Sequence, residues 1–153
     1  MTESGVEARI KRLEEIEAIK QLKYTYCYDL DISDFKAVCE LFTDDAIWDG
    51  KPFGTCKGKK QITEYFCETV PKKLPFFVHM VHNPIIKVKG NKATGVWYLT
   101  EPATLDDNRA VYICGRYDEK YVKVNGVWKF KEMRLKFFYV TPYEKGWVKQ
   151  RMI

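Results

Sequence analysis

A long apolar stripe near the start of the chain limits most strongly what this sequence can fold into. The stripe recurs at steps of three and four residues, at Val6, Ile10, Leu13, Ile16, Ile19, Leu22, Tyr26 and Leu30. This period is that of one face of an α-helix. We therefore predict a single long amphipathic helix that ends near Asp31 and needs a partner surface for its apolar face.

Shorter elements follow this helix. Ser33 or Asp34 is expected to cap a short helix over 35–42, and a short strand is expected at 46–49. A third helix is predicted over about 58–70. Helices thus occupy most of the first half of the chain.

The second half is strand-like. Two turn signals, Gly90-Asn91 and Asn125-Gly126, each separate apolar runs, and Asn-Gly favours a type I′ hairpin. The expected strands cover 76–81, 85–88, 93–101, 111–124 and 127–140. Helices followed by antiparallel strands indicate an α+β fold rather than a parallel α/β sheet. A long sheet with helices on one face can curl and enclose a pocket, and we expect one domain over 1–153, with a core of about 8–140 and a tail of 141–153.

Composition and motifs exclude several classes of function. The 26 basic residues are interspersed with 21 acidic ones, so the lysines are interpreted as solvated faces rather than a nucleic-acid stripe, although their excess can attract an anionic substrate. We identify no apolar run long enough to span a membrane and no signal peptide. The five cysteines include no CxxC pair and predict reduced thiols in a cytoplasm. No motif for a cofactor is present, and none is expected.

The predicted helix ends in a carboxylate, Asp31, which faces the negative end of the helix dipole and therefore needs compensation. The only histidines are His79 and His82, and one of them is the natural partner. Residues three apart in a strand point to opposite faces, so these two do not predict a metal site. An Asp–His pair can act as a base. From spacing alone, Asp31 could equally cap the helix that follows.

Other residues have two interpretations each. Tyr26 lies on the apolar stripe. Its hydroxyl could donate a hydrogen bond to a substrate oxygen, or the residue could be an ordinary core tyrosine. Glu101 follows Trp97 and Leu99 on one strand face, where it could point into a cavity or lie at a solvated strand end. The candidates for a pocket wall, with core packing as the alternative, are Trp48, Trp97, His82, Phe137 and Tyr139.

Three stretches together resemble the SnoaL-like branch of the NTF2-like superfamily. They are 16–31 with Phe42-Thr43-Asp44-Asp45-Ala46, the run His79-x-x-x-Asn83-Pro84, and 95–101 followed by Asn125-Gly126-Val127-Trp128. The resemblance covers roughly residues 8–140. It implies a cone in which three N-terminal helices pack on a strongly curved, mostly antiparallel mixed sheet that encloses a pocket.

Within that family the chain looks most like the bile-acid 7α-dehydratases, and more distantly like scytalone dehydratases and hexachlorocyclohexane dehydrochlorinases. The resemblance implies catalytic roles for Tyr26, Asp31 and His79, with Glu101 where the family has an aspartate. Trp48 stands near a second pocket tyrosine of the family, which has no clear counterpart here.

The implied function is a cofactor-independent lyase that dehydrates a polycyclic, steroid-like or aromatic small molecule. The alternatives are a ketosteroid-type isomerase, a carbon–carbon lyase acting on a lignin-like aromatic, or a non-catalytic binding module. The resemblance also implies a homo-oligomer, with a trimer favoured over a dimer, and neither nucleic acid nor membrane as a partner.

Overall fold

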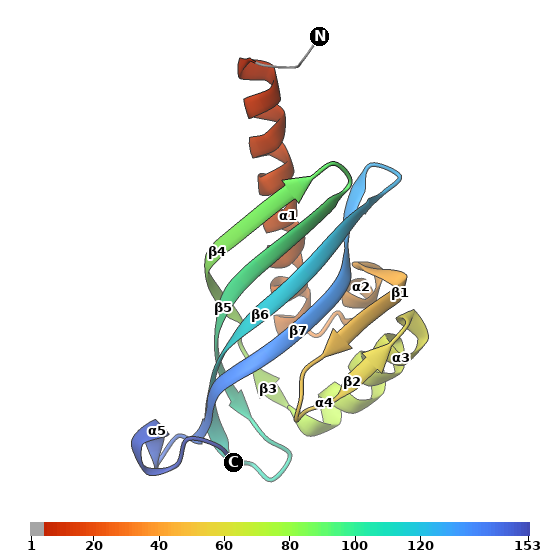
Figure 1. Ribbon diagram of the computed structural model, residues 1–153. Helices are drawn as coiled ribbons and strands as arrows, with labels where there is room; N and C mark the ends of the chain where they lie inside the picture. Colours follow the sequence, from red (N-terminus) through yellow and green to blue (C-terminus); the bar gives the residue numbers. More distant parts are fainter. Residues whose placement is uncertain (1–4) are drawn as a thin grey trace.

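The computed structural model describes residues 5–153 (Figure 1). A 26-residue helix comes first, a group of short helices and strands follows, and four long strands complete the sheet. In chain order the elements are α1 (Val6–Asp31), α2 (Phe35–Glu40), β1 (Phe42–Asp49), β2 (Thr55–Lys57), α3 (Lys59–Glu64), the π-helix η1 (Tyr65–Thr69), α4 (Val70–Lys73), β3 (Phe76–Phe77), β4 (Met80–Lys89), β5 (Lys92–Thr104), β6 (Ala110–Val124), β7 (Val127–Pro142) and α5 (Gly146–Lys149).

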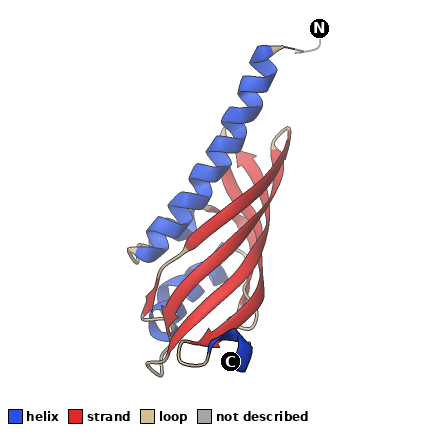
Figure 2. Ribbon diagram, turned by 90° about the vertical axis from the view of Figure 1, so that its left-hand side faces the viewer, coloured by secondary structure: helices blue, strands red, loops and turns tan. Residues whose placement is uncertain are grey.

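The strands form one curved sheet in the order β2-β1-β7-β6-β5-β3, with β4 also paired to β5. All pairings are antiparallel except that of β1 with β7. Helix α1 lies along one face of this sheet, and the shorter helices cover its lower part (Figures 1 and 2). The predicted α+β fold, with helices on a curved mixed sheet, is confirmed.

Local turn chemistry explains the hairpins. Asn125 and Gly126 both have positive φ, 50° and 83°, which a type I′ turn requires.

One predicted break between strands is wrong. The segment between the expected strands 76–81 and 85–88 belongs to β4, which has an irregularity between His82 and Ile85. Asn83 adopts a φ of 51° there and keeps the strand paired on both sides. No local pattern predicted β2 or α5.

The apolar stripe of α1 is buried only in its second half. Ile19, Leu22, Tyr26 and Leu30 pack into the core, whereas Val6, Ile10 and Leu13 are exposed. Figure 2 shows the reason, since the first turns of α1 extend beyond the sheet. The end of the helix that carries Asp31 is therefore the end that the core holds.

A buried ion pair fixes α1 on the sheet. The Lys23 Nζ lies 2.6 Å from Oε1 of Glu119 on β6, and both side chains are fully buried. The second carboxylate oxygen accepts the Tyr121 hydroxyl, which in turn accepts the Trp97 indole N–H at 2.9 Å. The ammonium also lies 3.2 Å from the ring centroid of Tyr117. Hydrogen bonds and π contacts thus replace much of the water that these two charges lose.

The five cysteines are free thiols, and Cys27, Cys39 and Cys56 are buried. Burial raises the pKa of these thiols to about 12, 11 and 11, respectively, so they are poor nucleophiles. Within residues 5–153 we find no helix that is both long and apolar enough to cross a membrane.

The buried pair predicts an asymmetric response to mutation. Lys23→Met should lower the free energy of unfolding by about 3–5 kcal/mol, because it leaves the Glu119 carboxylate buried without its cation. The double variant Lys23→Met/Glu119→Gln should recover much of that loss. Urea unfolding measures both. The matched control, Lys120→Met, removes the exposed pair with Glu132 and should cost only about 0–1 kcal/mol. If the double variant is less stable than Lys23→Met, the pair does not act as described.

Candidate active site

Asp31 and His79 form the centre of the candidate site. Asp31 is the last residue of α1, and its Oδ1 accepts the backbone N–H of His79 at 3.0 Å and lies 2.9 Å from the ring Nδ1. The other carboxylate oxygen lies 3.2 Å from the same backbone nitrogen. Asp34, rather than Asp31, caps α2 by accepting the Ala37 N–H. The acid at the helix end is thus compensated by a segment 48 residues away.

This contact assigns the imidazole tautomer. A carboxylate only accepts hydrogen bonds, so the neutral ring carries its proton on Nδ1 and leaves the Nε2 lone pair free. Nε2 lies 3.8 Å from Oε2 of Glu101, too far for a hydrogen bond between them. A substrate atom could therefore contact both groups.

Glu101, on β5, is a buried carboxyl group. Burial raises its pKa, the nearby His79 lowers it, and Asp31 raises it further. The raised pKa lets Glu101 keep its proton to a higher pH than an exposed glutamate, so it can donate a hydrogen bond as well as accept one.

Tyr26 is buried one and a half turns before Asp31 on α1, and its ring packs edge-on against His79 with centroids 6.3 Å apart. Burial raises the pKa of Tyr26 well above its ordinary value, while the Trp48 indole N–H acts in the opposite direction. The phenol thus stays protonated and can donate. The Trp48 Nε1 is itself buried and has no partner of ordinary hydrogen-bond geometry among residues 5–153.

A small cavity of about 50 Å³ lies beside these groups. Its walls are mostly aromatic and aliphatic, and His79 and Glu101 contribute its imidazole and its carboxyl group. The lining comprises Tyr26, Leu30, Trp48, Gly50, Phe53, Tyr65, Phe66, Val70, Leu74, Phe77, His79, Glu101, Ile113, Tyr117, Leu135 and Phe137. This free space is enough for one or two water molecules and far below the 300–1,000 Å³ of a typical ligand pocket.

The structure brings five predicted site residues to the cavity, and Asp31 joins them through His79. The five are Tyr26, Trp48, His79, Glu101 and Phe137. Three predicted wall residues lie elsewhere. Trp97 is buried in the core and donates to Tyr121, and His82 is exposed. Tyr139 stacks on Trp147 instead of facing the cavity.

A β-bulge explains the error at Tyr139. Cys114 pairs with Tyr139 and its neighbour Gly115 pairs with Phe137, so Phe138 is an extra residue in β7. The extra residue reverses the alternation, and Phe137 and Tyr139 point to opposite faces.

Tyr65 and Tyr117 line the cavity but were not predicted from the sequence as site residues. The signals for them were weak. Tyr65 falls on the inner face of the third predicted helix, and Tyr117 occupies an inward position in the alternation of β6. Such patterns equally describe ordinary core residues. Across residues 5–153 no group of three or more His, Cys, Asp or Glu side chains is arranged to hold a metal ion.

The curved sheet under helices is a fold shared with known proteins. The chain belongs to the SnoaL-like domain family, which it matches over residues 11–134. The similarity to bile-acid 7α-dehydratases in particular stays a prediction.

Solved structures agree in fold. Hexachlorocyclohexane dehydrochlorinase LinA-type3 from Novosphingobium barchaimii superposes with a TM-score of 0.80 at 25% identity, over 88% of this chain and 93% of that one. A scytalone dehydratase-like protein from Novosphingobium aromaticivorans has a TM-score of 0.79 at 25% identity, over 86% and 89%. An uncharacterized Mycobacterium tuberculosis protein is 26% identical over 113 residues, 72% of this chain and 77% of its own length. Dehydrochlorination and dehydration are both eliminations, so these neighbours indicate lyase-type chemistry in this family.

The raised pKa of Glu101 predicts a pH dependence of stability. The folded state holds the Glu101 proton more tightly than the unfolded state does, so the free energy of unfolding should fall as the pH rises from about 4.5 through the raised pKa. The slope from one group is at most about 1.4 kcal/mol per pH unit. Glu101→Gln should lack this fall, so chemical unfolding of both proteins at several pH values measures the difference. Glu14→Gln, on an exposed acid, is the control and should run parallel to the wild type. Parallel curves for Glu101→Gln would contradict the assignment.

Proposed function

We propose that this protein is a cofactor-independent lyase that eliminates water from a polycyclic, steroid-like or aromatic small molecule. The observation that carries the proposal is the placement of His79 and Glu101 at one mostly apolar cavity, with Asp31 bonded to the His79 ring. The family's dehydrochlorinase and dehydratase-like neighbours support an elimination in general terms. Dehydration, the substrate and the residue roles are our proposal.

In the proposed reaction the free Nε2 of His79 removes a proton from a carbon next to a carbonyl or conjugated group. Asp31 stabilises the imidazolium that forms, because its carboxylate already contacts Nδ1 at 2.9 Å. The electrons of the broken C–H bond delocalise onto the substrate oxygen. The Tyr26 hydroxyl donates a hydrogen bond to that oxyanion, as its raised pKa allows.

The second half of the reaction expels the hydroxyl group. As the electrons return from the oxyanion to form the C=C bond, the C–O bond breaks, and the hydroxide takes the proton from the His79 imidazolium and leaves as water. Glu101, in its protonated form, donates a hydrogen bond to the departing oxygen from the other side of the 3.8 Å gap. His79 ends as it began, so no external acid, base or oxidant is needed.

The aromatic walls suit a flat apolar substrate, but the cavity must open to admit one. The turn between β1 and β2 closes it, since Phe53 packs on Phe137 with centroids 5.4 Å apart. The backbone carbonyl of Phe53 also accepts the Tyr65 hydroxyl at 3.2 Å. We propose that this turn moves when substrate enters.

Assembly and location are further parts of the proposal. We propose a homo-oligomer, with a trimer favoured, in the cytoplasm. Two aromatic pairs on the exposed side of the sheet support self-association: Tyr98 with Phe138 and Tyr112 with Tyr143, with all four side chains exposed.

The two histidines should differ in their effect on activity. His79→Ala should lower kcat/KM by about 10²–10⁴-fold, as expected for loss of a general base. Asp31→Asn keeps an oxygen for the His79 donors but removes the charge, so its activity should fall strongly while the fold persists. His82→Ala, the exposed histidine, should stay near wild type.

The assay uses a panel of hydroxylated ketosteroids and aromatic hydroxyketones, with product mass as the readout. Loss of one water supports the proposal. An unchanged mass with a new spectrum supports an isomerase, and loss of formaldehyde a carbon–carbon lyase. Wild-type rates in both the Asp31 and His79 variants would falsify the proposed dyad, and binding without turnover of any compound would favour a binding module.

The closing turn gives a second prediction. Phe53→Ala removes the contact with Phe137, and Tyr65→Phe removes the hydrogen bond to the turn, so either variant should raise kcat/KM several-fold for bulky substrates. Steady-state kinetics on polycyclic and single-ring substrates measures the effect. Tyr28→Ala, on an exposed aromatic of α1 outside the cavity, is the control. A well-folded Phe53→Ala variant with an unchanged preference for ring number would contradict the gating role.

A further inference from the structure

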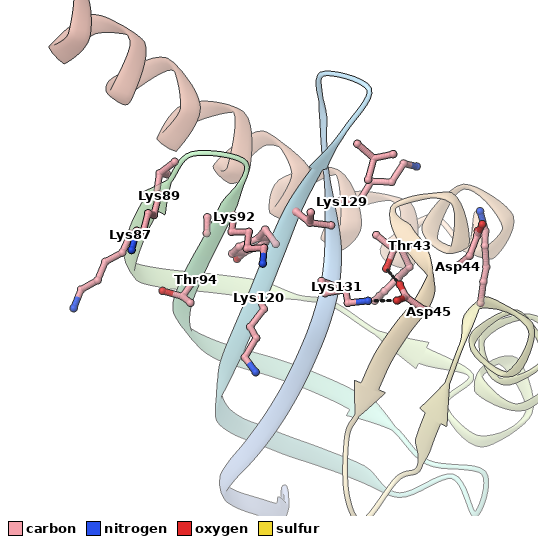
Figure 3. Close-up of a pocket in the computed structure, with 17 residues that line it drawn as sticks. Thr43, Asp44, Asp45, Lys87, Lys89, Lys92, Thr94, Lys120, Lys129 and Lys131 are labelled. Atoms are coloured by element: carbon pink, nitrogen blue, oxygen red, sulfur yellow. Dashed lines mark hydrogen bonds and ion pairs between the residues drawn. The ribbon is translucent and has the colours of Figure 1, made fainter. Parts of the chain in front are cut away.

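Lysines that are scattered in the sequence gather around one groove of the folded protein. The groove has a volume of about 880 Å³ and lies across β4, β5, β6, β7 and β1 (Figure 3). Its lysines are Lys59, Lys87, Lys89, Lys92, Lys120, Lys129 and Lys131. Ala93 and Trp97 are buried towards α1, so Lys92 and Thr94, which alternate with them on β5, face the opposite side of the sheet. The groove is therefore separate from the candidate active site.

The groove carries an excess of positive charge. Asp44 and Asp45 are its only acidic lining residues among those described, and Asp45 pairs with Lys131. Lys87, Lys89 and Lys92 have no ion-pair partner within residues 5–153. These three flank the turn between β4 and β5, where Lys89 and Lys92 are cross-strand partners of like charge. An anion would relieve that repulsion.

An apolar strip separates the lysines on the two sides. Val122 of β6 pairs in register with Lys92 of β5 on one side and with Lys129 of β7 on the other. Val124 follows two residues later on the same face and is partly exposed. From β4 to β7 the groove spans three strand spacings, roughly 14 Å.

This pattern selects the class of ligand. Single-stranded nucleic acid would need exposed aromatic rings on which bases can stack, but the aromatic residues of this groove, Phe42 and Tyr121, are buried. A valine strip between lysines instead complements a molecule with an apolar body and an acidic group.

We propose that the lysine groove binds a small anionic amphiphile, such as a medium-chain carboxylate. The apolar chain lies over Val122 and Val124, and the acidic group contacts Lys87, Lys89 and Lys92. The groove volume falls within the range of small-molecule sites. Binding here does not involve His79 or Asp31, so it stands or fails independently of the proposed lyase activity.

The test is calorimetric titration with decanoate below its micelle concentration, at two salt concentrations. Wild-type protein should bind decanoate, and higher salt should weaken the binding. The triple variant Lys87→Glu/Lys89→Glu/Lys92→Glu should weaken it about tenfold or more. Lys11→Glu/Lys36→Glu/Lys149→Glu makes the same change in net charge at exposed lysines outside the groove and should stay within about twofold of wild type.

Three further measurements complete the design. Val122→Thr/Val124→Thr should weaken decanoate binding without changing its salt dependence, and His79→Ala should leave it unchanged. The triple glutamine variant at Lys87, Lys89 and Lys92 replaces the glutamate variant if the latter is not folded by circular dichroism. Absence of wild-type binding, or equal weakening by the groove and control variants, would overturn the proposal. So would a change in oligomeric mass in the groove variant, because a second copy would then occupy the groove.

Discussion

The burial of Lys23 against Glu119 sets the position of α1, and the rest of the site depends on that position. A helix that packs through an apolar stripe alone can rotate or slide at little cost, whereas any such shift here would leave a charge buried and unpaired. Lys23, Tyr26 and Leu30 follow one another at helical spacing, so the ion pair also fixes where Tyr26 points. Asp31 lies eight residues beyond Lys23, about 12 Å along the axis. One contact in the core therefore determines where the acid at the helix end is placed.

Asp31 joins that helix to the sheet in a way that serves both folding and chemistry. Its carboxylate accepts the His79 backbone N–H, which holds the short segment between β3 and β4, and also contacts the ring nitrogen. The backbone hydrogen bond fixes the distance between His79 and the end of α1, and the ring contact fixes the orientation of the imidazole. Because both its backbone N–H and its ring Nδ1 are held by Asp31, His79 keeps its free Nε2 directed at the cavity. This arrangement supports the proposed role of His79 as a base with a single defined tautomer.

Local patterns predicted most of the fold. The 3.6-residue period of α1, the Asn125-Gly126 turn and the strand alternation of β6 are each encoded within a few neighbouring residues. The residues alone suggested Tyr26, Asp31, Glu101 and one of the two histidines, and the resemblance selected His79. The structure places Tyr26, His79 and Glu101 at one cavity, with Asp31 bonded to His79. The errors come from effects beyond neighbours: the bulge at Phe138 reverses Tyr139, and the irregularity in β4 joins two expected strands. The local sequence does not mark the bulge at Phe138, because it depends on pairing with another strand. Asn83 and Pro84 do mark the irregularity in β4, but they do not reveal that the same strand continues beyond it.

The different environments of the two carboxyl groups at the site suit the order of proton transfers in the proposed elimination. Two carboxyl groups flank one imidazole, and two buried anions this close would repel each other strongly. Burial raises the pKa of Glu101, whereas Asp31 is partly exposed and accepts its hydrogen bonds from His79. In the proposed reaction Glu101 therefore serves as the proton donor, and Asp31 serves as the charge that faces the imidazolium. When His79 takes a proton in that reaction, Asp31 would stabilise the new cation and Glu101 would donate to the leaving oxygen. Exchanging their environments would place the charge beside the departing hydroxide, where it would oppose the reaction.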